Sequence, residues 1–133
     1  MIARPYSPLD WDVIAPWFEA RPGWVAKDLA LLLPPNAWVV EDGGVPIAAC
    51  WLYLTDANVA LLEWSVTRPG TGLKGLRALE LAVKEAKKFA AIAEVLCIFQ
   101  FMPNERLVNY YERRCGFKAT ERCTLMVASP EGD

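Results

Sequence analysis

An asparagine and a tyrosine stand seven residues apart near the C-terminus, in a segment typical of an amphipathic helix. Leu107 and Val108 lie between Asn104 and Tyr111 and complete the spacing i, i+3, i+4, i+7 of a single helical face. The two polar residues are then two turns apart, about 10 Å along the axis. This face can contact an extended ligand at one end and take part in chemistry at the other. The structural alternative is that Asn104 only caps the helix and Tyr111 only packs in the core.

A glycine-rich loop over residues 68–75 precedes a long helix predicted from the spacing of Leu76, Leu79, Val83, Ala86 and Ala90. Glycines let backbone N–H groups approach an anion closely, and the following helix N-terminus adds the positive end of a dipole. Thr71 offers a hydroxyl and Lys74 a positive charge. The loop therefore predicts an anion site, with an ordinary turn as the alternative.

Glu63 is the candidate general base, in a strand expected over residues 59–67. A regular strand places Glu63, Ser65 and Thr67 on one side, and the opposite side then carries Leu62, Trp64 and Val66. A carboxylate there can accept a proton from a reacting group. The alternative is a solvated or salt-bridged strand residue.

Histidine is absent from the chain, which removes the usual Cys/His zinc patterns and the Ser-His and Cys-His nucleophile pairs. The four cysteines, at positions 50, 97, 115 and 123, form no C-x-x-C pair. We expect each to be a reduced, packed thiol. No metal is predicted.

Length and composition suit one compact domain, because 133 residues with 54% hydrophobic content leave little room for a second core. We expect that domain over residues 1–128 and a frayed tail over 129–133. The formal charge of −2 predicts no broad attraction to nucleic acid or to acidic membranes. The N-terminus lacks the blocks of a signal peptide, and no apolar run reaches about 18 residues, so a cytoplasmic location is expected.

The order of predicted elements defines an α+β sheet protein. Helices are expected over residues 9–20, 25–33 and 76–90 and from Asn104 to about Arg114. Strands are expected over residues 2–4, 37–41, 45–54, 59–67 and 95–101. Asp42-Gly43-Gly44 is a strong hairpin signal between two of them. Residues 117–127 are predicted to be β-rich, as one strand or as two.

Two segments make the chain resemble the GNAT (GCN5-related N-acetyltransferase) family over nearly its whole length. The first is the strand, glycine loop and helix around Val66–Leu76, which is similar to the family's Q/R-x-x-G-x-G/A pyrophosphate loop. It departs from that pattern at Thr67, three residues before Gly70, and the last motif glycine is either Gly72 or Gly75. The second segment runs from Asn104 through Tyr111 to Gly116-Phe117, one residue longer than the common family spacing, so Tyr110 is an alternative to Tyr111.

The resemblance implies an acyl-CoA N-acyltransferase fold, a mixed, mostly antiparallel central sheet flanked by helices. It implies that acetyl-CoA or another acyl-CoA is the co-substrate and that a strand edge pairs with the pantetheine arm. The implied cofactor-binding residues are Ser65, Val66, Thr67, Gly70, Thr71, Gly72, Leu73, Lys74, Gly75, Asn104 and Tyr111. Glu63 and Tyr111 are the implied catalytic residues, and Trp24 and Glu63 the implied contacts to the acceptor.

The activity implied by the resemblance is transfer of an acetyl group to a primary amine of a small molecule or a protein, by direct attack without an acyl-enzyme. The alternative is a non-catalytic module that binds CoA or a partner protein, because a fold does not by itself define a function. Modification of nucleic acid bases is disfavoured by the lack of net positive charge. GNAT-like proteins often form homodimers, and no segment of this sequence indicates an interface.

Overall fold

The computed structural model describes residues 1–19, 29–102, 104–126, 128, 130 and 131. By its internal contacts the chain divides into two compact units, Met1–Gln100 and Phe101–Asp133. The single domain expected over residues 1–128 stays a prediction. The expected tail, residues 129–133, lies mostly outside the described residues.

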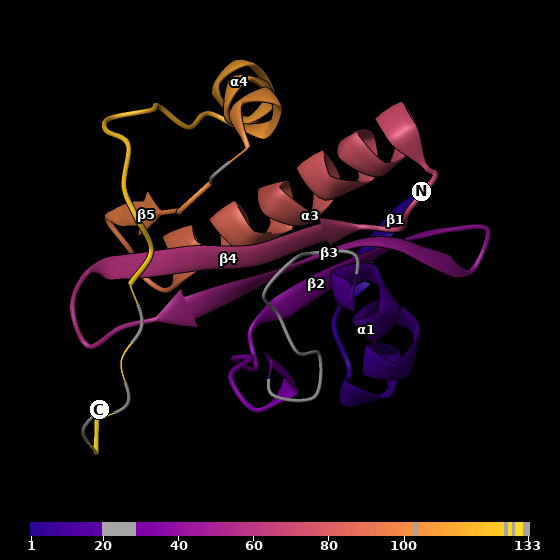
Figure 1. Cartoon of the computed structure of the whole chain (residues 1–133), viewed down its shortest axis with the longest axis horizontal. Coiled ribbons are helices and arrows are strands. Elements are labelled where there is room, and N and C mark those ends of the chain that lie inside the picture. The colour runs from indigo at the N-terminus through magenta and orange to yellow at the C-terminus, as the bar shows by residue number, and fades with distance from the viewer. Residues whose placement is uncertain (20–28, 103, 127, 129, 132–133) are drawn as a thin grey trace. The chain divides into compact units, whose positions relative to one another are not determined.

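Five strands of the described residues form one sheet in the first unit (Figure 1). They are β1 (Ile2–Pro5), β2 (Ala37–Asp42), β3 (Val45–Leu54), β4 (Val59–Thr67) and β5 (Cys97–Phe99). The strands lie in chain order, with antiparallel pairing from β1 to β4 and parallel pairing between β4 and β5. The predicted mixed, mostly antiparallel sheet is confirmed.

Two helices of the first unit cover opposite faces of this sheet (Figure 1). A short 3-10 helix, η1 (Pro8–Asp10), leads into α1 (Trp11–Glu19), and α3 (Gly72–Ile92) follows β4. Among the described residues, no helix is both long enough and apolar enough to cross a membrane.

Successive side chains of β2 and β3 point to opposite faces of the sheet, and each face carries its own apolar layer. On the face covered by α1, a buried cluster joins the helix to both strands and to β4: Ile14, Trp17, Phe18, Leu29, Ala37, Val39, Ala49, Trp51 and Val66. On the other face, the Trp38 ring meets Phe89 of α3, with ring centroids 5.5 Å apart. Residues directly opposite in antiparallel strands share a face, so the pairing register assigns the faces of β4 as well.

The boundaries of two elements differ from those expected. Helix α3 begins at Gly72 and not at Leu76, because its first turn does not contribute to the apolar stripe from which the start was inferred. Strand β5 covers Cys97–Phe99 and not residues 95–101, and Cys97 and Phe99 are exposed although a buried strand was expected. Among the strands of the described residues, β5 lies at the edge of the sheet and pairs with β4.

In the second unit, α4 (Glu105–Arg114) is confirmed, but the predicted strand is not. The described residues 117–126 contain no strand, and Val127 lies outside them. A strand requires a pairing partner, and burial of apolar side chains usually accompanies that pairing. Leu125 and Met126 are exposed in this segment. For residues 25–33, only Leu29 and Ala30 are described as helical, and positions 25–28 lie outside the described residues.

All four cysteines are free, but only half of them fit the expected environment. Cys50 and Cys115 are buried, as predicted for packed thiols. Cys97 and Cys123 are exposed, so the expectation of packing is wrong for these two. The first lies on the edge strand β5, and the second lies in the segment without secondary structure after α4.

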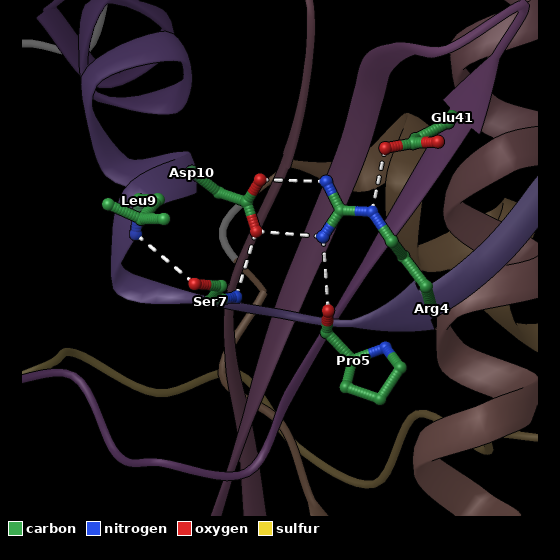
Figure 2. Close-up of polar contacts among 6 residues, drawn as sticks. All are labelled: Arg4, Pro5, Ser7, Leu9, Asp10 and Glu41. Carbon is green, nitrogen blue, oxygen red and sulfur yellow. Dashed lines mark hydrogen bonds and ion pairs between the residues drawn. The ribbon is translucent and has the colours of Figure 1, made fainter.

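A network of charges joins β1, β2 and the start of η1 (Figure 2). The Arg4 guanidinium donates to both carboxylate oxygens of Asp10, at 2.7 and 2.8 Å, and to Glu41 Oε1 at 2.7 Å. The backbone N–H of Ser7 also donates to Asp10 Oδ2, at 2.8 Å, which completes a capping box. The hydrogen bonds from Arg4 hold the pKa of Asp10 below its ordinary value, although partial burial opposes this shift.

The Asp10 network predicts a loss of stability in acid. A carboxylate with a lowered pKa in the folded state stabilises the protein above its unfolded pKa, near 4, and loses that contribution as pH falls towards the lower folded value. We expect Asp10→Asn to lower the free energy of unfolding at pH 7 by about 1–3 kcal/mol, with a smaller effect at the acid end of that window. Urea unfolding at several pH values measures this. Asp12→Asn, at an exposed position of α1, is the control, and equal effects of the two variants would contradict the expectation.

Gly75 lies where α3 begins to pack on β4. A Cβ atom at this position would lie 2.3 Å from Thr71 Oγ1 and 3.1 Å from Thr67 Cβ. The Thr71 hydroxyl cannot move away freely, because it donates a 2.6 Å hydrogen bond to the carbonyl of Arg68. Close packing of the helix start on the preceding loop therefore requires glycine here.

For Gly75→Ala we expect a net loss of stability of about 1–2 kcal/mol, although alanine favours helices by about 1 kcal/mol over glycine, because the added methyl group overpacks the contact with Thr71. Thermal unfolding measures the loss. In a Thr71→Ala background, which removes Oγ1, the same substitution should cost clearly less. An equal cost in both backgrounds would assign the loss to another contact.

Candidate functional site

The pairing of β4 with β3 contains a bulge next to Glu63. Trp51 lies opposite Glu63 and Ala49 lies opposite Val66, so one residue of β3 faces two residues of β4, Trp64 and Ser65. Trp64 has a φ of 61°, in the left-handed region that bulky residues rarely adopt. The predicted strand at residues 59–67 is confirmed in extent, but it is not regular.

This bulge changes which side chains share a face. Glu63 and Val66 lie opposite Trp51 and Ala49, two residues of the cluster under α1, so both face α1. Trp64 also packs against that cluster. Thr67 lies opposite Ala48 on the α3 face. The expected grouping of Glu63 with Thr67, and of Trp64 with the opposite side, is therefore wrong, because one extra residue reverses the alternation beyond it.

Tyr53 is a neighbour of Glu63 that the sequence analysis did not single out. Its hydroxyl accepts a hydrogen bond from Trp64 Nε1 at 2.7 Å and donates one to the carbonyl of Leu32 at 2.8 Å. Burial raises the pKa of Tyr53, the bond from Trp64 lowers it, and the charge of Glu63 raises it, with a net increase. The phenol thus stays protonated beside the Glu63 carboxylate at neutral pH.

Strand β5 pairs with only the first part of β4. The parallel ladder joins Val59–Leu61 to Cys97–Phe99, whereas β4 continues to Thr67. Beyond the ladder, Gln100 Nε2 donates to Ser65 Oγ at 3.4 Å. The bulge therefore lies in the part of β4 that continues past β5. A strand edge of this kind can add an extended ligand through main-chain hydrogen bonds.

The glycine loop follows β4 directly and leads into α3. Gly70 and Gly72 have positive φ values of 82° and 53°, which require glycine for the tight turn. Thr71 is the N-cap residue of α3, yet its side chain does not cap the helix, because its hydroxyl donates to the carbonyl of Arg68. Because the Thr71 hydroxyl does not cap the helix, it does not occupy the first N–H groups of α3, which can bind an anion.

The remaining candidates in this loop have different surroundings. Leu73 is 57% exposed. Lys74 Nζ forms an ion pair with Asp42 Oδ2 at 2.6 Å, at the β2–β3 turn, so its charge is already engaged. Gly75 lies within α3 and packs on Thr71, so the loop turn is formed by Gly70 and Gly72.

In the second unit, Asn104 is the N-cap of α4. Its Oδ1 accepts from the backbone N–H groups of Arg106 and Leu107, at 2.9 and 3.2 Å, as the structural alternative expected. Tyr111 is 3% exposed, and its ring meets Phe117 edge-on at 5.4 Å. The carbonyl of Tyr111 accepts from Cys115 and Phe117, which ends the helix before Gly116.

The structure brings together one part of the predicted site. Glu63, the residues of β4 beyond the ladder and the glycine loop form a continuous stretch in the first unit. Asn104 and Tyr111 belong to the second unit, and Trp24 lies outside the described residues. In the described part of the chain, no group of three or more His, Cys, Asp or Glu side chains could hold a metal ion.

The comparisons with known proteins address the family and the fold. The model of the Acetyltransferase (GNAT) family matches residues 5–117. No curated protein matches the chain. Similar solved structures include Rv2747 from Mycobacterium tuberculosis in complex with CoA and NLQ, with a TM-score of 0.75, 14% identity and coverage of 95% of this chain and 76% of that one.

Two further structures are N-acetyltransferases. The ribosomal-protein-S18-alanine N-acetyltransferase from Escherichia coli has a TM-score of 0.70 and 13% identity, with 84% of this chain and 74% of that one covered. The aminoglycoside antibiotic 6'-N-acetyltransferase from Acinetobacter haemolyticus has a TM-score of 0.67 and 14% identity, with 97% and 99% covered. At such low identity these similarities establish the fold alone. The family model, however, extends from the end of β1 to the residues that follow α4, and the chain therefore belongs to the GNAT acetyltransferase family.

Proposed function

We propose that the chain transfers an acetyl group from acetyl-CoA to a primary amine of a small molecule or a protein. The observation that carries this proposal is the continuous stretch from Glu63 to Leu73. It combines a carboxylate, a strand that continues past its neighbour, and a glycine turn at the start of a helix. These are the parts that a thioester acyl donor with a pyrophosphate requires.

CoA would bind along this stretch. The backbone of Ser65, Val66 and Thr67 would pair with the pantetheine arm as an added strand does. The N–H groups around Gly70, Thr71, Gly72 and Leu73 would bind the pyrophosphate, supported by the dipole of the 21-residue helix α3. Lys74 would contribute by exchanging Asp42 for a phosphate oxygen. Asn104 would be a further contact to the cofactor.

The reaction would be a direct attack on the thioester. Glu63 would take a proton from the acceptor ammonium, the amine nitrogen would bond to the acetyl carbon, and the carbon–sulfur bond would break. Tyr111 would protonate the departing thiolate. The reference pKa values, near 10 for the phenol and 8.5 for the thiol, make this transfer uphill by only about 2 kcal/mol. The second proton that the nitrogen loses as the amide forms would replace, through water, the proton that Tyr111 donates. Trp24 would line the acceptor side. A cytoplasmic location and a homodimer stay predictions of the sequence.

A non-catalytic module with this fold is the second candidate. It is favoured by two predicted cofactor contacts that serve other roles, since Lys74 pairs with Asp42 and the amide oxygen of Asn104 caps α4. Such a module would bind CoA or a partner protein without turnover.

Binding of CoA at the glycine loop is tested with Leu73→Glu and Leu73→Gln. Position 73 is exposed, so neither variant disturbs the core, and only the first adds a negative charge next to the expected pyrophosphate. By calorimetric titration we expect Leu73→Glu to weaken CoA binding by about tenfold, through like-charge repulsion. Leu73→Gln should stay within about threefold of the wild type. Equal affinities of the two variants would place the pyrophosphate elsewhere, and no binding by the wild type would sink the proposal.

The roles in chemistry are tested with Glu63→Gln and Tyr111→Phe, which preserve shape and remove the proton-transfer groups. With an amine found by a thiol-release screen, we expect kcat to fall by about a hundredfold or more for each, and CoA affinity to change little. The controls are Glu85→Gln, on the exposed face of α3, and Tyr110→Phe. A loss in Tyr110→Phe in place of Tyr111→Phe would identify Tyr110 as the acid. Wild-type turnover by Glu63→Gln would remove Glu63 as the base.

A further inference from the structure

Trp64 occupies a backbone conformation that disfavours its own side chain. Its φ of 61° belongs to the region where Cβ crowds the neighbouring backbone, and glycine is the residue that usually fills such a bulge position. A bulky residue persists there only where the surroundings hold it. The surroundings of Trp64 therefore determine the conformation of β4 between Glu63 and Val66.

One side-chain contact ties the Trp64 indole to the neighbouring strand. Trp64 Nε1 donates a 2.7 Å hydrogen bond to the hydroxyl of Tyr53, which lies two residues after Trp51 on β3 and so shares its face. The indole also packs on the cluster under α1. The hydroxyl thus holds the tryptophan on the same face as Glu63.

The Tyr53 hydroxyl is in turn held by a second contact. It donates a 2.8 Å hydrogen bond to the carbonyl of Leu32, in the segment that precedes β2. One hydroxyl therefore uses its donor and an acceptor site at once. Because burial and the charge of Glu63 raise the pKa of Tyr53, the hydroxyl keeps its proton at neutral pH and makes both bonds.

We propose that Tyr53 is a positioning residue for the acyl transfer, because its hydroxyl, fixed by Leu32, holds Trp64 and with it the bulge that sets the positions of Glu63 and of the backbone that follows. This inference rests on the proposed function. Tyr53 takes no part in proton transfer. It acts through Trp64, so its loss should misplace the reacting groups and leave the pyrophosphate loop intact.

The contact itself is tested without any activity measurement. The indole N–H signal that is missing from the NMR spectrum of Trp64→Phe identifies Trp64 among the six tryptophans. In Tyr53→Phe we expect that signal to shift and its hydrogen exchange to become faster. Tyr6→Phe is the matched control, because the ring of Tyr6 contacts that of Trp51 on the same face, and this variant should leave the signal unchanged. An unchanged signal in Tyr53→Phe would overturn the proposal.

The consequence for the reaction is tested by kinetics and titration on the same variants. We expect Tyr53→Phe to lower kcat by about tenfold to a hundredfold, with the Kd of free CoA within about twofold of the wild type. Trp64→Phe, which keeps an aromatic side chain and loses the N–H donor, should behave in the same way. The kcat of the double variant should be no lower than that of the poorer single variant, because both substitutions remove the same hydrogen bond.

The outcomes separate this inference from the proposed function. If the Trp64 signal changes but kcat does not, or if the effects of the two variants multiply, the positioning role is wrong and the acyltransferase proposal stands. If the wild type neither binds CoA nor turns over, the proposed function fails and the positioning role fails with it. In that case the indole signal still decides whether Tyr53 holds Trp64.

Discussion

The pairing of β4 with β3 on the two sides of Cys50 governs the arrangement of the candidate site. Up to Glu63, the odd-numbered residues of β4 face α1. From Val66 onward, after the bulge, the even-numbered residues face α1. Because side chains alternate with a period of two, a single extra residue reverses the faces. It puts the carboxylate and Val66 under α1 while leaving Thr67 under α3, where Gly75 packs on it.

The loop that follows is constrained from both ends. Its first end is set by the register of β4, since the N–H of Arg68 donates to the carbonyl of Ile47 at 2.8 Å and its guanidinium lies over the Trp17 ring. Its second end is set by the packing of Gly75 on Thr71. Between them, two glycines with positive φ turn the chain into α3. The direction of the helix N-terminus therefore depends on contacts on both faces of the sheet.

The elements that the sequence predicted well are those with a local signal. The Asp42-Gly43-Gly44 turn and its apolar flanks predicted β2 to within one residue and β3 with its observed bounds. The β-prone run over residues 59–67 predicted β4 with its observed bounds, and Asn104 marked the start of α4. The bulge was not predictable, because Glu63 and Ser65 alternate with apolar residues as they would in a regular strand. The contact between Tyr53 and Trp64 depends on that bulge and was missed with it. The strand predicted after Gly116 failed because β propensity does not supply a pairing partner.

The ion pair between Lys74 and Asp42 has a consequence for how the loop meets an anion. Both side chains are substantially exposed, at 59% and 38%, so water competes for each of them and their attraction adds little to the stability of the fold. A weak pair is readily exchanged. In this structure Asp42 offsets the positive charge of Lys74 beside the glycine loop. In the proposed complex, the two linked phosphates of CoA would displace the carboxylate and release it to solvent, so Asp42 would compete with the ligand for Lys74.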